Sequence, residues 1–177
     1  MLSGCAGVPK HKEFRNDRYK MLIPYWATYS ATDDDLKKID NDEVETLGVH
    51  SDGYPVNGQV PIFVEGLVNI YRFKNILPEE QSINQLYCDS IMNDIVTKNS
   101  EQKIEKKITE FIEKSEKQKE HCKLIYFAFN DEEERNSNEK LAEKQQIVSY
   151  HFLYGKDEIV AEIQNLKDEE DDIILTA

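Results

Sequence analysis

The sequence is short of positive charge. It holds 22 lysines and arginines against 35 aspartates and glutamates, which gives a net charge of −13. Nucleic-acid backbones and anionic lipid surfaces both bind clustered basic side chains, so this balance argues against either as a direct partner. The sequence also lacks any apolar run near the ~20 residues that a helix needs to cross a bilayer.

Common catalytic and nucleotide-binding motifs are missing as well. The seven glycines are scattered, and they form neither a dinucleotide-binding pattern nor a phosphate-binding loop. The nucleophile elbow of the α/β-hydrolases is absent. His50, Ser51 and Asp52 have the residue types of a catalytic triad, but triads assemble from distant segments and these three are adjacent. We therefore expect a protein that is not an enzyme and uses no cofactor.

Acidic runs at residues 33–35 and 40–43 invite a calcium interpretation. An EF-hand loop needs glycine at its sixth position and glutamate at its twelfth. For a loop that starts at Asp40, those positions are occupied by Glu45 and Ser51. The pattern fails, and we predict a solvated acidic surface and no metal site.

The three cysteines carry more information. Cys5 ends the sequence Leu2-Ser3-Gly4-Cys5, which resembles the lipobox of bacterial lipoproteins, where the peptidase cuts before the cysteine and the thiol carries diacylglycerol. Only four residues precede Cys5, whereas a signal peptide has an apolar region of roughly 7–15 residues there. The resemblance implies that this region lies upstream of Met1; the alternative is an ordinary cysteine. Ala6 in place of aspartate after the cysteine implies the outer membrane.

Cys88 and Cys122 then remain as an even pair. In an oxidising periplasm they are candidates for a disulfide, and in a reducing compartment they would be two core thiols. The sequence leaves both states open, because pairing depends on a Cα separation under about 7 Å.

The pattern of apolar residues predicts an α+β fold with a mainly antiparallel β-sheet, in one form a sandwich, and an inserted pair of amphipathic helices. Gly66 is expected to mark a β-bulge, and residues 158–166 fit either a helix or a strand. The first predicted helix carries an apolar stripe from Ile83 to Val96 that includes Leu86. Strands are expected at residues 19–29, 45–50, 60–73, 123–129, 147–154 and 173–175, and helices at 78–96 and 101–120.

The length of 177 residues suits a single domain. We expect residues 1–18 to be a truncated signal, lipid anchor and tether, because residues 6–18 are polar and lack periodicity. Residues 19–177 are then one globular domain with an acidic C-terminal tail.

A second, fainter resemblance concerns the outer-membrane lipoprotein of the type VI secretion system. In that family a turn-rich stretch leads into a strand of the form V-x-I-Y-x-L and then a helix. Here Val-Asn-Gly-Gln-Val-Pro at 56–61 precedes Val-Asn-Ile-Tyr-Arg-Phe at 68–73 and the predicted helix, and residues 124–131 are similar to its later strand and acidic turn. The resemblance implies a β-sandwich that holds an inner-membrane partner in the periplasm.

Two kinds of exposed side chain are candidates for contact with a partner. Acidic loops attract a basic partner and speed its capture, and tyrosines left exposed on a strand favour protein contact. The candidate partner-binding residues are Asp131, Glu132, Glu133, Glu134, Tyr150 and Tyr154.

The sequence thus predicts a periplasm-facing lipoprotein that is anchored at Cys5 in the outer membrane and binds another protein. It would act as an inhibitor or immunity protein, or as an envelope assembly component such as the secretion lipoprotein. The alternative is a cytoplasmic acidic inhibitor from a phage or mobile element, whose carboxylates stand in for the phosphates of nucleic acid.

Overall fold

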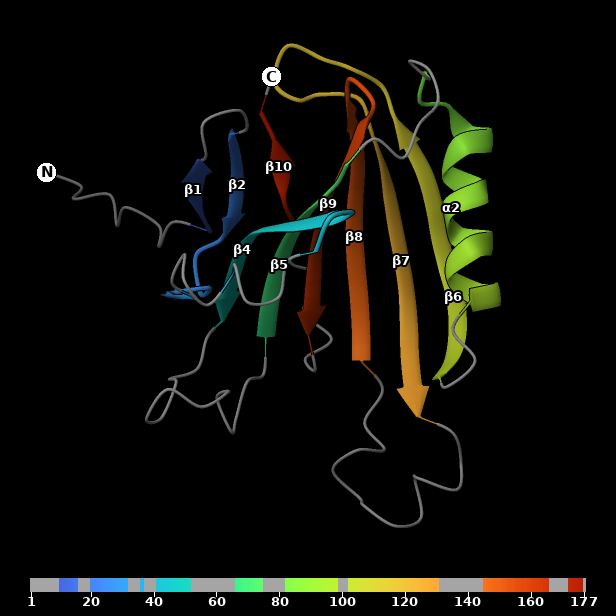
Figure 1. Ribbon diagram of the computed structural model, residues 1–177, viewed down its shortest axis with the longest axis horizontal. Helices are drawn as coiled ribbons and strands as arrows, with labels where there is room; N and C mark the ends of the chain where they lie inside the picture. Colours follow the sequence, from blue (N-terminus) through green and yellow to red (C-terminus); the bar gives the residue numbers. More distant parts are fainter. Residues whose placement is uncertain are drawn as a thin grey trace, which may run out of the picture.

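The computed structural model describes residues 10–15, 20–31, 36, 41–51, 66–74, 82–98, 102–130, 145–165 and 172–176. Within them the chain forms two antiparallel β-sheets and an α-helix that packs beside one of the sheets (Figure 1). The strands are β1 (His11–Arg15), β2 (Lys20–Pro24), β3 (Tyr29–Ser30), β4 (Val44–Ser51), β5 (Gly66–Phe73), β6 (Gln102–Ile112), β7 (His121–Asn130), β8 (Gln145–Tyr154), β9 (Asp157–Asn165) and β10 (Ile174–Leu175), and the helix is α2 (Gln85–Lys98).

The two sheets are unequal in size. Among the described residues, the smaller sheet has three strands in the order β1-β2-β10, and the larger has seven in the order β3-β4-β5-β9-β8-β7-β6. Strand β8 forms a tight hairpin with β9 through Gly155, whose φ of 61° suits the turn. The α+β class with a mainly antiparallel sheet is therefore confirmed, and the two sheets make a sandwich-like arrangement.

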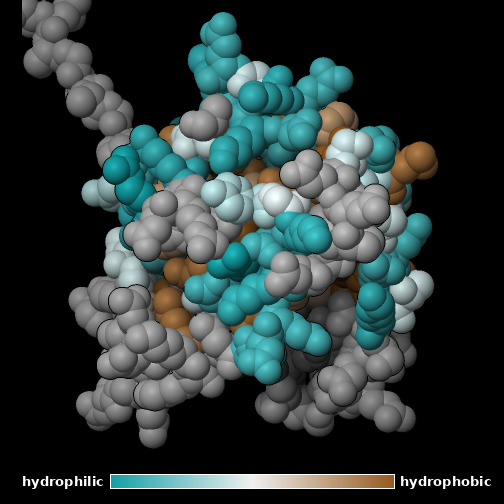
Figure 2. Space-filling view, turned by 45° about the horizontal axis from the view of Figure 1, so that its top comes forward, coloured by the Kyte–Doolittle hydropathy of each residue, from teal (hydrophilic) through white to brown (hydrophobic). Residues whose placement is uncertain are grey.

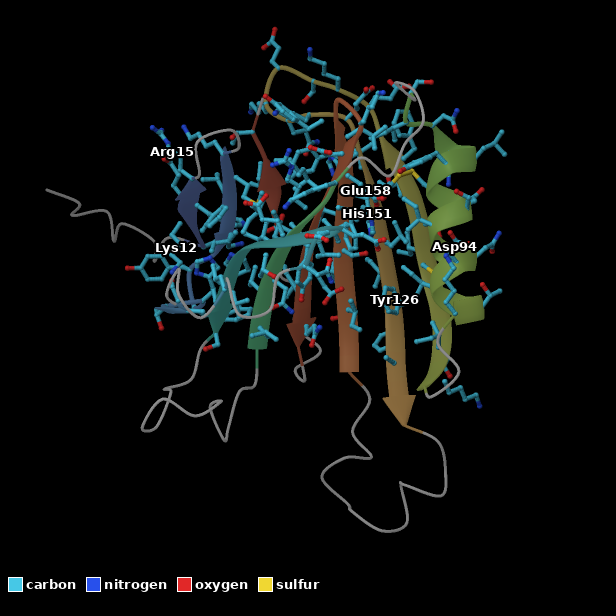
Figure 3. The ribbon with its side chains drawn as sticks, viewed as in Figure 1. Lys12, Arg15, Asp94, Tyr126, His151 and Glu158 are labelled. Carbon is cyan, nitrogen blue, oxygen red and sulfur yellow. A yellow bond between two sulfur atoms is a disulfide. The ribbon has the colours of Figure 1, made fainter. Side chains whose placement is uncertain are left out.

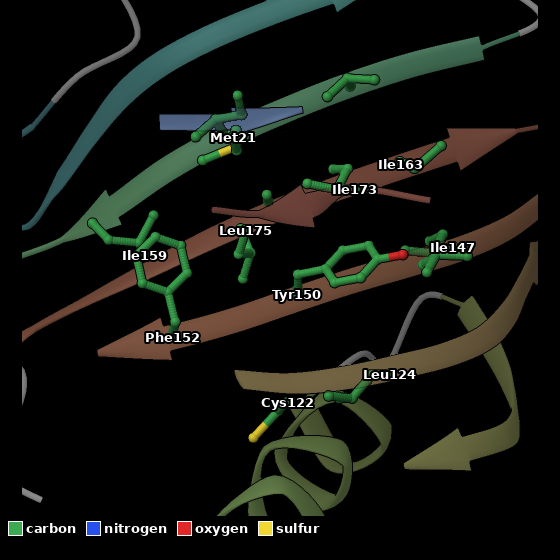
Figure 4. Packing of buried hydrophobic residues seen from close by; sticks show 14 of the residues in the cluster. Met21, Cys122, Leu124, Ile147, Tyr150, Phe152, Ile159, Ile163, Ile173 and Leu175 are labelled. Carbon is green, nitrogen blue, oxygen red and sulfur yellow. The ribbon is translucent and has the colours of Figure 1, made fainter. Parts of the chain in front are cut away.

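The core lies where the large sheet faces the small one. Side chains alternate between the two faces along β8. Tyr150 and Phe152 therefore share one face, and both point toward Leu175 and Met21 of the small sheet (Figure 4). These side chains are buried and belong to one hydrophobic cluster that includes both sheets. The intervening residues of β8, Ser149 and His151, must face the opposite side of the large sheet.

Helix α2 covers one end of that opposite face. It packs against β6 and β7, and Asn84 caps it by accepting a hydrogen bond from the Tyr87 N–H at 2.9 Å. Met92 is buried against the sheet, but Leu86, which the apolar stripe placed in the core, is 79% exposed. No helix among the described residues has the length and apolar character needed to cross a membrane.

The second predicted helix is wrong. Residues 102–112 form strand β6, which pairs with β7 along its whole length and has an irregularity between Lys106 and Ile108. The four-residue spacing of Ile104, Ile108 and Ile112 fits one helix face, but an even spacing fits one side of a regular strand as well. In β6 the irregularity after Lys106 turns Ile108 and Ile112 to the side opposite Ile104. Pairing with the apolar strand β7 decides between the two, because tertiary contacts outweigh a weak local propensity.

Two other expectations change. The tether predicted for residues 6–18 is wrong at residues 11–15, because these form β1 and pair with β2. The ambiguous residues 158–166 belong to strand β9 as far as Asn165, since β9 is hydrogen-bonded to β5 on one side and β8 on the other. The spacing of apolar residues alone also allowed a helix, but hydrogen bonding to a strand on each side stabilises the extended conformation.

Candidate binding site

A disulfide fixes the helix to the sheet. The structure joins Cys88 of α2 to Cys122 of β7, with the two Cα atoms 5.4 Å apart. Both cysteines are fully buried. Of the two states that the sequence left open, the structure contains the disulfide.

Beside the helix, three polar side chains of the β8–β9 hairpin form a hydrogen-bonded chain. The Ser149 Oγ lies 2.9 Å from the His151 Nε2, and the His151 Nδ1 lies 2.6 Å from the Glu158 Oε1. A neutral ring that donates from Nδ1 to the carboxylate accepts the serine hydroxyl at Nε2. His151 and Glu158 point toward each other on the side of the sheet that carries α2 (Figure 3).

The chain borders a hollow of about 270 Å³ between α2 and the large sheet. Its aromatic walls are Tyr71 and Phe73 of β5 and Tyr126 of β7, and Ile95 closes the helix side. Glu162 of β9 lines it together with the hydrogen-bonded chain. The register explains the grouping, because Tyr71 pairs with Val160 and Ser149 pairs with Glu162 across neighbouring strands.

Burial and the glutamates keep the phenols of this region protonated. Burial, with a smaller contribution from the negative charge of Glu162, raises the pKa of Tyr71 to about 12. The pKa of Tyr126 is raised by the same two causes, in the same order. Tyr87 of α2 hydrogen-bonds to Glu158, and burial followed by that carboxylate raises its pKa. The hollow is therefore lined by neutral hydroxyl groups beside two carboxyl side chains.

The two predicted tyrosines have different environments. Tyr154 is 44% exposed at the end of β8, as a contact residue would be. Tyr150 is only 2% exposed, so its predicted role as a partner contact is wrong. It lies on the core side of a central strand, where it packs beside His121 with the two ring centroids 5.7 Å apart.

The remaining predicted site residues lie outside the described residues. These are the lipid-attachment candidate Cys5 and the acidic candidates Asp131, Glu132, Glu133 and Glu134. They stay predictions from the sequence.

The residues that line the hollow were not singled out from the sequence as one site. Tyr71, Tyr126, Ser149 and Glu162 come from four different strands, so no single segment reveals them. One signal was available. Ser149 and His151 are polar residues two apart on an apolar central strand, which is unusual enough to indicate a polar partner on the facing side.

The described surface on one face of the molecule is largely hydrophilic. Figure 2 shows hydrophilic side chains over much of it, with hydrophobic side chains exposed between them and at its edges. Among the residues that the structure describes, no group of three or more His, Cys, Asp or Glu side chains is arranged to hold a metal ion.

No model of a known protein family matches the chain, and no curated protein sequence matches it either. The interpretation of the site therefore depends on its own geometry.

Proposed function

We propose that this protein is an exported, non-enzymatic lipoprotein that binds another protein at the periplasmic face of the outer membrane. The observation that carries the proposal is the buried Cys88–Cys122 disulfide. Disulfides persist in oxidising compartments and are rare where glutathione keeps thiols reduced. The disulfide thus supports export, and export is what the lipobox-like residues before Cys5 imply.

The same observation weighs against the cytoplasmic alternative. A cytoplasmic inhibitor that imitates nucleic acid would hold these two cysteines as thiols. They are fully buried and join different elements, so they form part of the core and are not a transient surface pair. The overall acidity fits either location and does not separate the two.

Binding is favoured over catalysis by the surroundings of Ser149. Its connection to His151 and Glu158 has the order of a nucleophile, base and carboxylate. However, Ser149 is 1% exposed, and β8 is hydrogen-bonded to a neighbouring strand on each side. An acyl-transfer site needs N–H donors at the developing oxyanion, and the backbone of a fully paired strand has none to offer. We interpret the chain of hydrogen bonds as a support for the hollow.

The state of the cysteines in the cell tests the proposal. Cells that produce the protein are quenched in acid, and free thiols are tagged with a maleimide polymer before and after reduction. We expect Cys88 and Cys122 to be tagged only after reduction. Tagging of both cysteines without reduction would mean that the protein is in a reducing compartment, and it would overturn the proposal that the protein is exported.

Lipid attachment is tested by metabolic labelling with a palmitate analogue. The natural gene with its upstream region should incorporate label, and the Cys5→Ala variant should not. A Cys88→Ala, Cys122→Ala variant is the matched control, because it removes two cysteines and should still be labelled. Label that persists in Cys5→Ala would rule out anchoring through this residue.

A role like that of the type VI secretion lipoprotein is a second candidate. Residues 68–73 lie in β5, helix α2 follows, and residues 124–130 lie in β7, in the order that the resemblance implies. This role predicts binding to the periplasmic segment of that system's inner-membrane partner. A pull-down with that segment separates it from an immunity protein, which would instead bind a basic toxin.

A further inference from the structure

The hollow beside α2 has an unbalanced charge. Two of its lining residues are Glu158 and Glu162, and no lysine or arginine is among the described residues that line it. Glu158 already has two partners, the His151 ring and the Tyr87 hydroxyl. Glu162 is different, because its hydrogen bond comes from the uncharged amide of Gln164 at 2.6 Å.

The net charge of the hollow is negative whether the His151 ring is neutral or protonated. If the ring is neutral, both carboxylates contribute negative charge. If it is protonated, it forms an ion pair with Glu158, and the charge of Glu162 still has no cation beside it among the described residues. Partial burial strengthens the resulting field, because solvent screens it less than it would on an open surface.

The aromatic walls favour the same kind of ligand. Tyr71 and Phe73 lie next to each other with ring centroids 6.5 Å apart, and Tyr126 lines the hollow from β7. The face of an aromatic ring attracts a cation through its quadrupole, and a guanidinium group also stacks on it. Aromatic walls with a carboxylate are therefore the chemistry that recognises an organic cation.

We propose that this hollow binds a lysine or arginine side chain presented by the protein partner. The inference depends on the proposed function, because that function makes the occupant part of a protein. The cationic head would lie against Glu162, and its carbon stem would contact the rings of Tyr71 and Tyr126. The net charge of −13 on the whole chain would attract the same basic partner from a distance.

The experiment measures binding of single side chains to the purified full chain with its disulfide intact. The probes are Nα-acetyl-arginine amide and Nα-acetyl-lysine amide, followed by chemical shifts of backbone amides in NMR. The neutral comparators are the citrulline and norleucine amides, which match the two probes in shape. We expect millimolar binding of the cations, with shifts centred on Tyr71, Tyr126 and Glu162, and at least tenfold weaker binding of the neutral compounds.

Glu162→Gln is the decisive variant, because it removes the charge and keeps the shape. It should weaken cation binding about tenfold. Glu116→Gln is the matched control: it removes one negative charge from an exposed position outside the hollow and should leave the affinity within twofold of the original. If Glu162→Gln does not fold, Tyr71→Leu tests the aromatic wall and should weaken binding by a similar factor.

Three results would overturn the proposal. Equal binding of the neutral amides would mean that the hollow does not select for charge. Equal effects of Glu162→Gln and Glu116→Gln would mean general attraction to an acidic protein. Binding of spermidine that depends on Glu162 and is tenfold tighter than that of either amide would assign the hollow to a free polyamine. None of these measurements depends on the cell compartment, so the inference and the proposed function can fail separately.

Discussion

His50 lies between the two sheets with one ring nitrogen satisfied. Its Nδ1 is 2.8 Å from the Ser30 Oγ, and its buried Nε2 has no hydrogen-bond partner. Burial, with a smaller contribution from the charge of Lys12, lowers the pKa of His50 to about 4 from its usual value of 6.5. Protonation of His50 is therefore unfavourable in the folded state.

The pH dependence of stability follows from this shift. Between pH 4 and 6.5 the unfolded chain binds more protons at His50 than the folded chain does, so this residue makes the free energy of unfolding rise with pH in that window. The slope of the unfolding free energy is at most about 1.4 kcal/mol per pH unit. Solvent that reaches the partly exposed ring makes the slope smaller than this limit. Urea unfolding at a series of pH values should give a flatter profile for His50→Gln. Ser30→Ala, which keeps the buried ring, should retain the slope.

Gly66 is required by close approach and does not mark a bulge. The β5–β9 register is regular there, and the irregularity of this part of the sheet lies in β4 between Thr46 and Gly48. A Cβ added at Gly66 would lie 2.5 Å from a ring carbon of Trp26. The expected bulge is thus wrong, and the glycine makes room for the indole ring.

Gly66→Ala should consequently destabilise the protein by about 1–3 kcal/mol, the usual cost of overpacking a filled site. Trp26→Leu should remove most of that extra cost, so the double variant should be less destabilised than the sum of the two single variants. Thermal or urea unfolding measures both. Additive effects of the two substitutions would contradict the contact.

At the scale of elements, α2 depends on its disulfide more than on its sequence. Only Cys88 and Met92 of its residues are buried, and Leu86 and Val96 are among the exposed large apolar side chains. The cross-link, with a sequence separation of 34, restricts the unfolded chain. By loop entropy this contributes about 3–4 kcal/mol.

Reduction should therefore lower the unfolding free energy by about 3–4 kcal/mol. The double variant Cys88→Ala, Cys122→Ala should lose a similar amount and become insensitive to dithiothreitol. Circular dichroism should show that the helix melts before the sheet in the reduced protein. A reduced protein with unchanged stability would contradict the assigned role of the cross-link.

The sequence predicts some of these strands and helices better than others. Strands with consistent alternation, such as β8, and the buried strand β7 were predictable because their period and their burial agree. Residues 101–120 were not, since lysines, glutamates and isoleucines four apart satisfy a helix and an edge strand equally. Polar, charged composition is how an edge strand avoids pairing with another chain, and β6 is the edge of the large sheet.

The hollow was beyond sequence reasoning for a related reason. Its walls come together only when β5, β9, β8 and β7 take their order in the sheet, and that order is set by long-range pairing. Glu158 and Glu162 looked like ordinary charges of an ambiguous segment. Only the fold shows that both lie on one side of a central strand and line the same hollow.

At the scale of the whole molecule, the small sheet brings distant parts of the chain together. Strands β1 and β10 both pair with β2, and the His11 Nε2 lies 2.5 Å from the Asp172 Oδ1. Leu175 is buried in the core, and its carbonyl accepts a hydrogen bond from the Lys119 N–H at 3.0 Å. The last strand thus closes the sandwich from the side opposite α2.

Leu175→Ala should therefore cost about 2–5 kcal/mol, as a large-to-small change in a filled core does. Ile174→Ala is the matched control, because the neighbouring side chain is only half-buried and its loss should cost less. Urea unfolding of both variants gives the comparison. Equal losses at the two positions would mean that β10 does not cover the core.

The position of β1 has a consequence for orientation at a membrane. Five residues after Cys5 the chain reaches Lys10, and five extended residues span at most about 17 Å. If Cys5 carries the lipid, the start of β1 is held within about that distance of the bilayer surface. The hollow lies on the face of the large sheet that is turned away from the small sheet, so an anchor attached through β1 would leave it open to a partner that approaches from the interior of the periplasm.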